Sequence, residues 1–214
     1  MSALERTDLT SDAHAQEEFD VNEEYGDDLP KTLLLMAIEE ATGKDEFVTA
    51  LITLGAKADL KNTILETVPF HDAIRNTDPD LLKLVLRSVS NINIQDGEGS
   101  SALHLATEGL IDSDEENIDK LIECIGVLLQ YPGIEINSED MKGEATPLFY
   151  AATAANEKAV DLLLSFGADA HNNNTGETIC DVIRQNIPDF DPVKFNKTRK
   201  GVDKEHLIQH HRAC

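Results

Sequence analysis

Tryptophan is absent from this chain of 214 residues, and aromatic residues of all kinds amount to 5% of it. A core with few large rings must be mostly aliphatic, which suits stacked small helices better than a β-sandwich. Long hydrophobic runs are lacking too, because the longest clean one, residues 33–38, is far shorter than the ~20 apolar residues of a membrane-spanning helix. The acidic N-terminus has no apolar stretch typical of a signal peptide. These absences predict a soluble chain that does not itself insert into a membrane.

Cysteine is scarce. Cys124, Cys180 and Cys214 are few, far apart and odd in number, so no disulfide framework is implied. A reducing compartment is the simpler interpretation, and we therefore expect a cytoplasmic protein. Cys124 and Cys180 fall in helical apolar patterns, which predicts that both are buried, inert thiols.

Positive charge is in short supply, with 18 Lys and Arg against 41 Asp and Glu and a net charge of −23. This balance argues against binding to nucleic acid or to anionic membranes, because both are negatively charged. It favours a protein partner with a basic surface. Residues 1–28 alone hold ten acidic residues against one basic residue, Arg6, and few apolar ones. That composition predicts a disordered, solvated tail, with an acidic docking arm as the alternative.

The C-terminal segment, residues 188–214, is polar and contains a basic run. This run either pairs with the acidic remainder of the chain or binds a partner. Its members are Lys194, Lys197, Arg199, Lys200 and Lys204.

Recognisable catalytic motifs are also missing. No Ser or Cys nucleophile motif accompanies His71 or His104. Gly97 and Gly99 are not followed by the further glycine, or by the Lys-Ser/Thr pair, that a phosphate-binding loop has at fixed spacing. A cluster near the C-terminus offers the nitrogen and sulfur ligands that zinc prefers, but it matches no standard zinc spacing and lies where disorder is the default. We therefore predict no enzyme, no catalytic or metal site and no cofactor. The cluster consists of His206, His210, His211 and Cys214.

One stretch, residues 140–169, organises the rest of the chain. Thr146 can cap a helix, and Pro147 follows at the first helical position, where a missing N–H costs nothing. Asn156 breaks this helix from a second one, which Gly167 is placed to end. The two predicted helices have apolar stripes at helical spacing, made of Leu148, Ala151 and Ala152 and of Val160, Leu163 and Leu164.

The same arrangement recurs along the chain, with helix-start positions at Thr32, Val68, Ser101, Thr146 and Thr178. Their separations are 36, 33, 45 and 32 residues. The spacing of 45 contains an acidic insert, residues 112–116, which we expect to lengthen the loop between the two helices. The pattern predicts about four helix pairs followed by a half-unit that caps the array.

These residues resemble the ankyrin repeat. The signature T-P-L-x-x-A-A followed by V-x-x-L-L-x-x-G-A-D in the fourth unit is similar to that family, whose unit of about 33 residues has two helices and a β-turn. The resemblance implies an all-α solenoid of paired antiparallel helices with β-turn connections over residues 29–187. It also implies that His71 and His104 are structural, each bonding within its turn. Leu35 and Phe149 replace this histidine in two units, where the turn should be less rigid.

The resemblance implies a non-enzymatic protein–protein interaction module or scaffold. The expected contacts lie at turn tips and at exposed positions of the first helices. Among the residues there, tyrosine is a common interface anchor and methionine adapts to the shape of a partner. The candidate residues are Asp96, Glu98, Met141, Lys142, Glu144, Tyr150, Asn172 and Asn173.

Residues 128–137, residues 183–190 and the long inter-helix loop of the third unit resemble the ankyrin region of insect ankyrin-type transient receptor potential channels. This implies an alternative, in which the chain is a truncated or excised cytosolic N-terminal domain with a regulatory or assembly role. A longer transcript of such a channel would encode several downstream runs of about 20 apolar residues.

Overall fold

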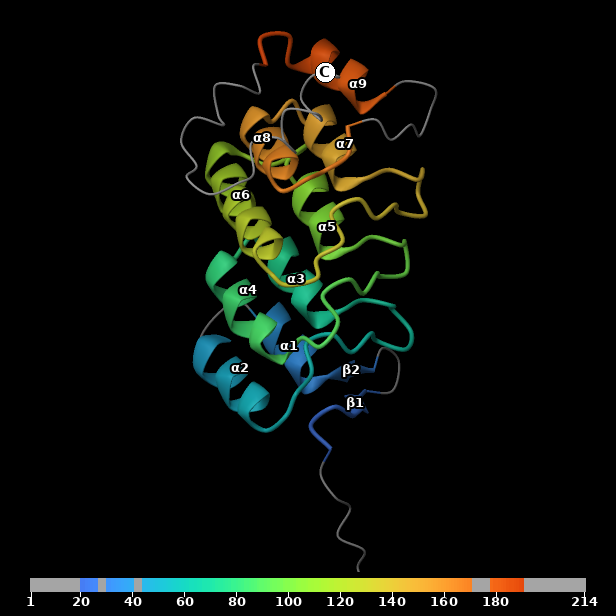
Figure 1. Cartoon of the computed structure of the whole chain (residues 1–214). Coiled ribbons are helices and arrows are strands. Elements are labelled where there is room, and N and C mark those ends of the chain that lie inside the picture. Colours follow the sequence, from blue (N-terminus) through green and yellow to red (C-terminus); the bar gives the residue numbers. More distant parts are fainter. Residues whose placement is uncertain (1–19, 27–29, 41–43, 171–177, 191–214) are drawn as a thin grey trace, which may run out of the picture.

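The computed structural model describes residues 20–26, 30–40, 44–170 and 178–190. Within these residues the chain forms nine α-helices, one short 3₁₀ helix and a sheet of two short strands. The helices stack in two rows (Figure 1), and successive helices of each row are in contact. The predicted all-α solenoid of helix pairs is therefore confirmed.

The first row contains the helices that open each unit. They are α1 (Leu33–Glu39), α3 (Pro69–Arg75), α5 (Ala102–Glu108), α7 (Pro147–Thr153) and α9 (Ile179–Asn186). The second row contains the helices that return along them, namely α2 (Lys44–Thr53), α4 (Pro79–Val85), α6 (Glu115–Leu129) and α8 (Glu157–Ser165). The 3₁₀ helix, η1 (Leu86–Ser88), extends α4.

All five predicted helix-start positions are N-caps of first-row helices. The Thr32 and Thr146 hydroxyls each accept a bond from the backbone N–H three residues later, at 3.2 and 3.4 Å. Ser101 and Thr178 form capping boxes. Val68 has no hydroxyl and makes no side-chain cap, so that α3 begins on Pro69 alone. Local sequence thus sets where each unit begins, because the caps satisfy backbone N–H groups that lack helical partners.

The second-row helix of the fourth unit, α8, stops just before Gly167, as predicted. Its φ of +97° lies in the left-handed region, which a residue without Cβ adopts freely. The backbone N–H groups of Gly167 and Ala168 then bond to the carbonyls of Leu164 and Leu163, at 3.0 and 3.1 Å. The second unit has no glycine at this point, and α4 instead tightens into η1 before Val89 becomes extended.

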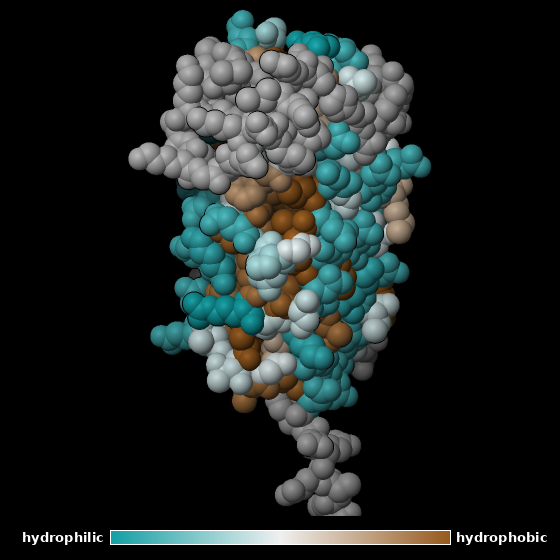
Figure 2. Space-filling view, viewed as in Figure 1, coloured by the Kyte–Doolittle hydropathy of each residue, from teal (hydrophilic) through white to brown (hydrophobic). Residues whose placement is uncertain are grey.

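The core is aliphatic and runs through the whole array. Phe70 is the one aromatic ring among its largest fully buried side chains within the described residues. Ala151 and Ala152 are completely buried on α7, and their small size lets that helix contact both α5 and α9. Figure 2 shows a band of hydrophobic residues along the array between polar margins. Partly buried residues such as Ile94 and Ile134 extend the core outward.

The acidic insert of the third unit lengthens a helix more than a loop. The connection between α5 and α6 covers residues 109–114, and Glu115 and Glu116 already belong to the first turn of α6. Asp114 caps that helix by accepting a 2.9 Å bond from the Asn117 N–H. Carboxylates are favourable at a helix N-terminus, where the dipole is positive. The prediction that all of residues 112–116 extend the loop is therefore wrong for the last two.

Residues 20–26 are ordered, although they fall in the segment predicted to be a disordered tail. Val21 is 6% exposed and belongs to the common core. Strand β1 (Glu24–Tyr25) pairs antiparallel with β2 (Lys31–Thr32). The Asn22 side chain accepts a 2.8 Å bond from the Lys57 N–H, which ties this segment to the chain that follows α2, at the end of the first unit. For these residues the prediction is wrong, because composition alone does not show which residues far away in the sequence will pack against them or bond to them.

The two described cysteines differ. Cys124 is buried and free, and burial raises the pKa of its thiol to about 12, so it is inert as predicted. Cys180 is also buried but is disulfide-bonded, which contradicts the prediction of a free thiol. Among the described residues, no helix combines the length and apolar character needed to cross a membrane.

Replacing Leu163 by Ala tests the assigned core. Leu163 is fully buried on α8, and its truncation should lower the free energy of unfolding by about 2–5 kcal/mol in urea denaturation. The matched control is Leu54→Ala, because Leu54 is 65% exposed and should change stability by less than about 0.5 kcal/mol. Equal effects from the two variants would contradict the packing described above.

Candidate protein-binding surface

The turns that join successive units project beside the first-row helices (Figure 1). Three of them precede α3, α5 and α7, at residues 58–68, 92–101 and 136–146, and we call these turns 1, 2 and 3. An equivalent backbone hydrogen bond spans each turn: Asn62 N–H to Thr67 O, Asp96 N–H to Ser100 O, and Asp140 N–H to Ala145 O, at 2.8, 3.0 and 3.0 Å. The predicted turn connections are thus present at equivalent places.

A buried Asn or Asp side chain stabilises each turn from inside. Asn62, Asp96 and Asp140 are 3–5% exposed. The side-chain oxygen of each accepts hydrogen bonds from two backbone N–H groups of its own turn. These bonds compensate for burying a polar group. The turns are therefore held by residues that a partner would not reach.

Asp96 was expected to contact a partner, and the structure corrects this. Its second carboxylate oxygen pairs with the Arg75 guanidinium at 2.8 Å, and Arg75 also binds Asp72 at 2.9 Å. Asp96 is only 5% exposed. It holds turn 2 and joins it to α3, which leaves its carboxylate no free surface for binding.

Tyr150 on α7 is half-buried, and its hydroxyl donates a 2.6 Å bond to Asp140. Burial, together with this bond, raises the pKa of Tyr150. Burial also favours a higher pKa for Asp140, but bonds from Tyr150 and from two backbone N–H groups outweigh it and lower that pKa. Tyr150 can therefore offer a partner its ring, while its hydroxyl is already used.

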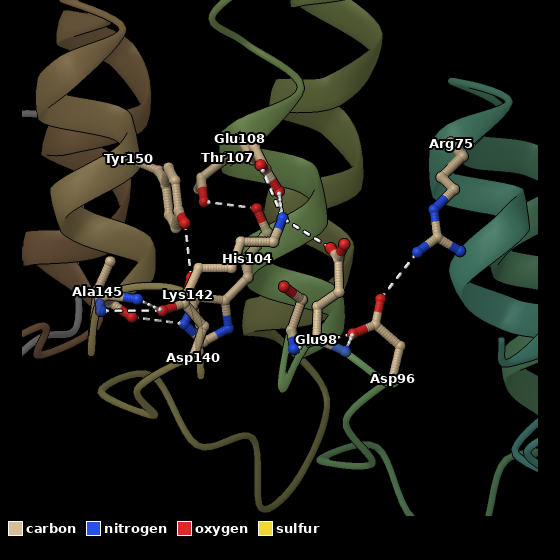
Figure 3. Close-up of polar contacts among 12 residues, drawn as sticks. Arg75, Asp96, Glu98, His104, Thr107, Glu108, Asp140, Lys142, Ala145 and Tyr150 are labelled. Carbon is tan, nitrogen blue, oxygen red and sulfur yellow. Dashed lines mark hydrogen bonds and ion pairs between the residues drawn. The ribbon is translucent and has the colours of Figure 1, made fainter. Parts of the chain in front are cut away.

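Three other candidates gather on the outside of turns 2 and 3. The Lys142 ammonium lies between Glu98 of turn 2 and Glu108 of α5, 2.9 Å from each (Figure 3). Partial burial acts to lower the Lys142 pKa, but the two carboxylates outweigh it and raise it. The Met141 N–H bonds to the Glu98 carbonyl at 3.1 Å, while its side chain is 78% exposed.

Glu144 is exposed beside this cluster in turn 3, and it adopts a positive φ of 54°. Asn172 and Asn173 lie outside the described residues, as does the histidine-rich cluster at residues 206–214. Glu108 completes the ion-pair cluster, but sequence analysis missed it. Its partner Lys142 is 34 residues away, so no local pattern connects the two.

Turns 2 and 3 lie in contact because residue 99 is glycine. Its φ is +76°, and a Cβ added there would stand 2.7 Å from the Met141 backbone nitrogen. Any side chain would thus clash with the neighbouring turn. The close approach of the two turns depends on this residue.

The two buried histidines behave differently. His104 Nδ1 accepts a 3.1 Å bond from the Ser101 N–H, and its Nε2 lies 3.0 Å from the Ala145 carbonyl of the next unit. The predicted structural role of His104 is therefore confirmed. His71 is fully buried, and within the described residues neither ring nitrogen has a partner with hydrogen-bond geometry, although the Ile94 backbone lies nearby. The bond expected within its turn is therefore absent.

A groove of about 340 Å³ opens beside this cluster. It lies where α3 and α5 end, under the connection from α5 to α6. Its lining combines aliphatic walls with a charged and hydroxyl-bearing rim. The lining residues are Ile74, Arg75, Thr77, Leu105, Glu108, Gly109, Asp112, Ser113 and Leu121. Glu108 belongs both to the groove and to the ion-pair cluster, so the two surfaces are continuous.

The fold and these turns define the chain as a solenoid of repeated helix pairs. The family model for the ankyrin repeat matches residues 144–175, which cover the end of turn 3 and the helices α7 and α8. Because the other units repeat this arrangement of turn, first helix and returning helix, the chain is an ankyrin-repeat protein.

Several known proteins share this similarity. The E3 ubiquitin-protein ligase KEG of Arabidopsis thaliana is 30% identical over 118 residues, which is 55% of this chain and 7% of that protein. The human palmitoyltransferase ZDHHC13 is 30% identical over 166 residues, or 66% of this chain and 26% of that protein. The mouse B-cell lymphoma 3 protein homolog is 26% identical over 152 residues, or 58% and 34%. The similarity thus spans at most about a third of these relatives' length.

Gly99→Ala should lower stability by about 2 kcal/mol or more, because the new Cβ meets backbone and a positive φ strains any other residue. Urea denaturation measures the loss. Gly143→Ala is the matched control from turn 3, since a Cβ there meets nothing within 4 Å. If both variants unfold like the wild type, turns 2 and 3 do not pack as described.

His71 should make stability fall in mild acid. Burial, with a smaller contribution from Arg75, lowers its pKa from 6.5 to about 3, and Asp96 opposes this only in part. Between these values the unfolded chain binds a proton that the folded chain does not, so stability is lost as the pH falls below 6.5. From pH 6.5 to 5 this amounts to about 2 kcal/mol.

The measurement compares urea denaturation of the wild type and of His71→Leu at the two pH values. Other titrating groups are common to both proteins, so the difference isolates His71. A pH dependence that is the same in both would show that His71 is not the group responsible.

Proposed function

We propose that this chain is a non-enzymatic interaction module that binds another protein through turns 2 and 3 and the adjoining face of α5. The observation that carries the proposal is the exposed, rigid cluster of Glu98, Met141 and Lys142. A side chain as apolar as Met141, 78% exposed on a structured turn, is a candidate contact, because methionine adapts to a partner's shape. Glu144 lies at its edge.

The preformed character of the turns supports the same proposal. Buried Asp96 and Asp140 hold the turns, and Gly99 lets them pack together. A surface that is already ordered loses less conformational entropy on binding than a flexible one. Ankyrin repeats typically bind other proteins, and this preorganisation suits the same role.

The partner we propose carries a basic surface, because the chain has a net charge of −23. Complementary charge accelerates association and orients the partner. We place the module at about residues 20–187 and propose a cytoplasmic location. The catalytic activities named for the ubiquitin ligase and the palmitoyltransferase are those of much longer proteins, and they form no part of this proposal. The channel-domain alternative stays a prediction.

The double variant Met141→Ser/Glu144→Gln tests the proposal. Both side chains are exposed, so stability should change by less than about 0.5 kcal/mol. Affinity for a partner captured with the intact chain should fall about tenfold, which corresponds to about 1.4 kcal/mol. The measurement is isothermal titration calorimetry with the purified partner, together with a thermal melt of each variant.

The matched control is Leu54→Ser/Asp119→Asn, which removes one exposed apolar side chain and one carboxylate from second-row helices and their ends. It should bind like the wild type. If the control loses binding while the turn variant keeps it, and both are folded, the partner uses the second-row face and the proposed surface is wrong.

A further inference from the structure

The groove between α3, α5 and α6 exists because of the insert in the third unit. The second and fourth units pass from first to second helix in a few residues, through Thr77 and Ala155, both with positive φ. In the third unit the connection covers residues 109–114. It brings Asp112 and Ser113 to the rim beyond the end of α5.

The walls of the groove suit the stem of a long side chain. Ile74 and Leu121 are 1% and 3% exposed, and Leu105 is partly buried beside them. Lysine and arginine place their methylene stems against apolar surface of this kind while the charged head stays at the water boundary. A volume of about 340 Å³ leaves room for one such side chain.

The rim carries excess negative charge. Arg75 is its one cation, and that charge is already shared by Asp72 and Asp96. Glu108 shares the Lys142 ammonium with Glu98, so two carboxylates there face one cation. Asp112 adds a further carboxylate to the rim; it is exposed and forms no ion pair with any described residue.

We infer that the groove binds a cationic side chain, arginine or lysine, from a basic segment of the partner protein. Its stem packs on Ile74, Leu105 and Leu121, and its head meets Asp112 and Glu108. Hydrogen bonds to ionised carboxylates are stronger than neutral ones, and a guanidinium can bridge two of them. This inference rests on the proposed function, since the groove adjoins the turn surface through Glu108, but it assigns a separate anchoring point.

The test uses N-acetyl-L-arginine amide as the probe on the isotope-labelled full chain, followed by NMR chemical-shift titration. Saturable shifts are expected at the backbone amides of Thr77, Gly109 and Ser113. N-acetyl-L-citrulline amide has nearly the same shape without the charge, and it should produce no saturable shift. Equal responses to the two probes would overturn the inference.

Asp112→Asn should weaken binding of the arginine probe about two- to fivefold, the size of one exposed charge pair. The matched control is Asp119→Asn on α6, which removes one exposed negative charge just as Asp112→Asn does, but at a residue outside the groove lining. It should leave the affinity unchanged. If both variants weaken binding equally, the probe senses only the overall acidity and the groove is not a site.

A second comparison tests whether the groove is open to a partner or is occupied by the basic run of this same chain. In one variant the five basic residues of the C-terminal run, Lys194, Lys197, Arg199, Lys200 and Lys204, are all changed to Ser. Unchanged affinity for the probe supports a groove open to a partner. A gain in affinity, with shifts at the groove amides of the free protein, would identify this run as the occupant and overturn the partner assignment.

The two proposals can fail independently. Binding of a partner that depends on Met141 and Glu144, without any response of the groove to arginine, would keep the proposed function and eliminate the anchor. If the groove binds arginine while the Met141→Ser/Glu144→Gln variant binds the partner normally, the arginine site is kept and the proposed turn surface is eliminated.

Discussion

Each helix pair in this protein has an aliphatic face that only the neighbouring pairs can cover. Burial of such faces is the main favourable contribution to folding, and here it is shared between units instead of being completed within each one. Ala151 and Ala152 show how the sharing works, since their small side chains let α7 lie against α5 on one side and α9 on the other. The turns, the charged cluster and the groove all depend on this stacking, because each is built from more than one unit. Loss of one internal contact such as Leu163 therefore affects the surface as well as the core.

Polar groups give the stacked units a defined register. His104 reaches from the start of α5 to the Ala145 carbonyl, and Asp96 reaches from turn 2 to Arg75 of α3. Such groups are costly to bury unless they are paired, so they favour the arrangement in which each one finds its partner. His71 has no such partner among the described residues. Burial keeps it neutral, at the expense of stability in mild acid.

The third unit departs most from the repeat, and its departures coincide with the candidate binding features. The insert extends α6 to 15 residues and places Asp112 over the end of α5. The adjoining turns carry Glu98, Met141 and Lys142. A repeat scaffold tolerates such an insertion because the added residues lie outside the faces that stack. Variation of the repeat can therefore create a local site without disturbing the array.

The sequence by itself determined the units and their limits, because caps, glycine stops and apolar periodicity act within a few residues. Thr146, Gly167 and the leucines of α8 could all be predicted in this way, and so could the exposed turn-tip residues Glu98, Met141, Lys142 and Glu144. Only the tertiary structure decided which groups meet across units. It turned Asp96 from a predicted contact into an internal support, added residues 20–26 to the fold, and joined Lys142 to Glu108 across 34 residues. Such contacts depend on how the units stack in space, and no local pattern in the chain encodes the distance between two side chains on different units.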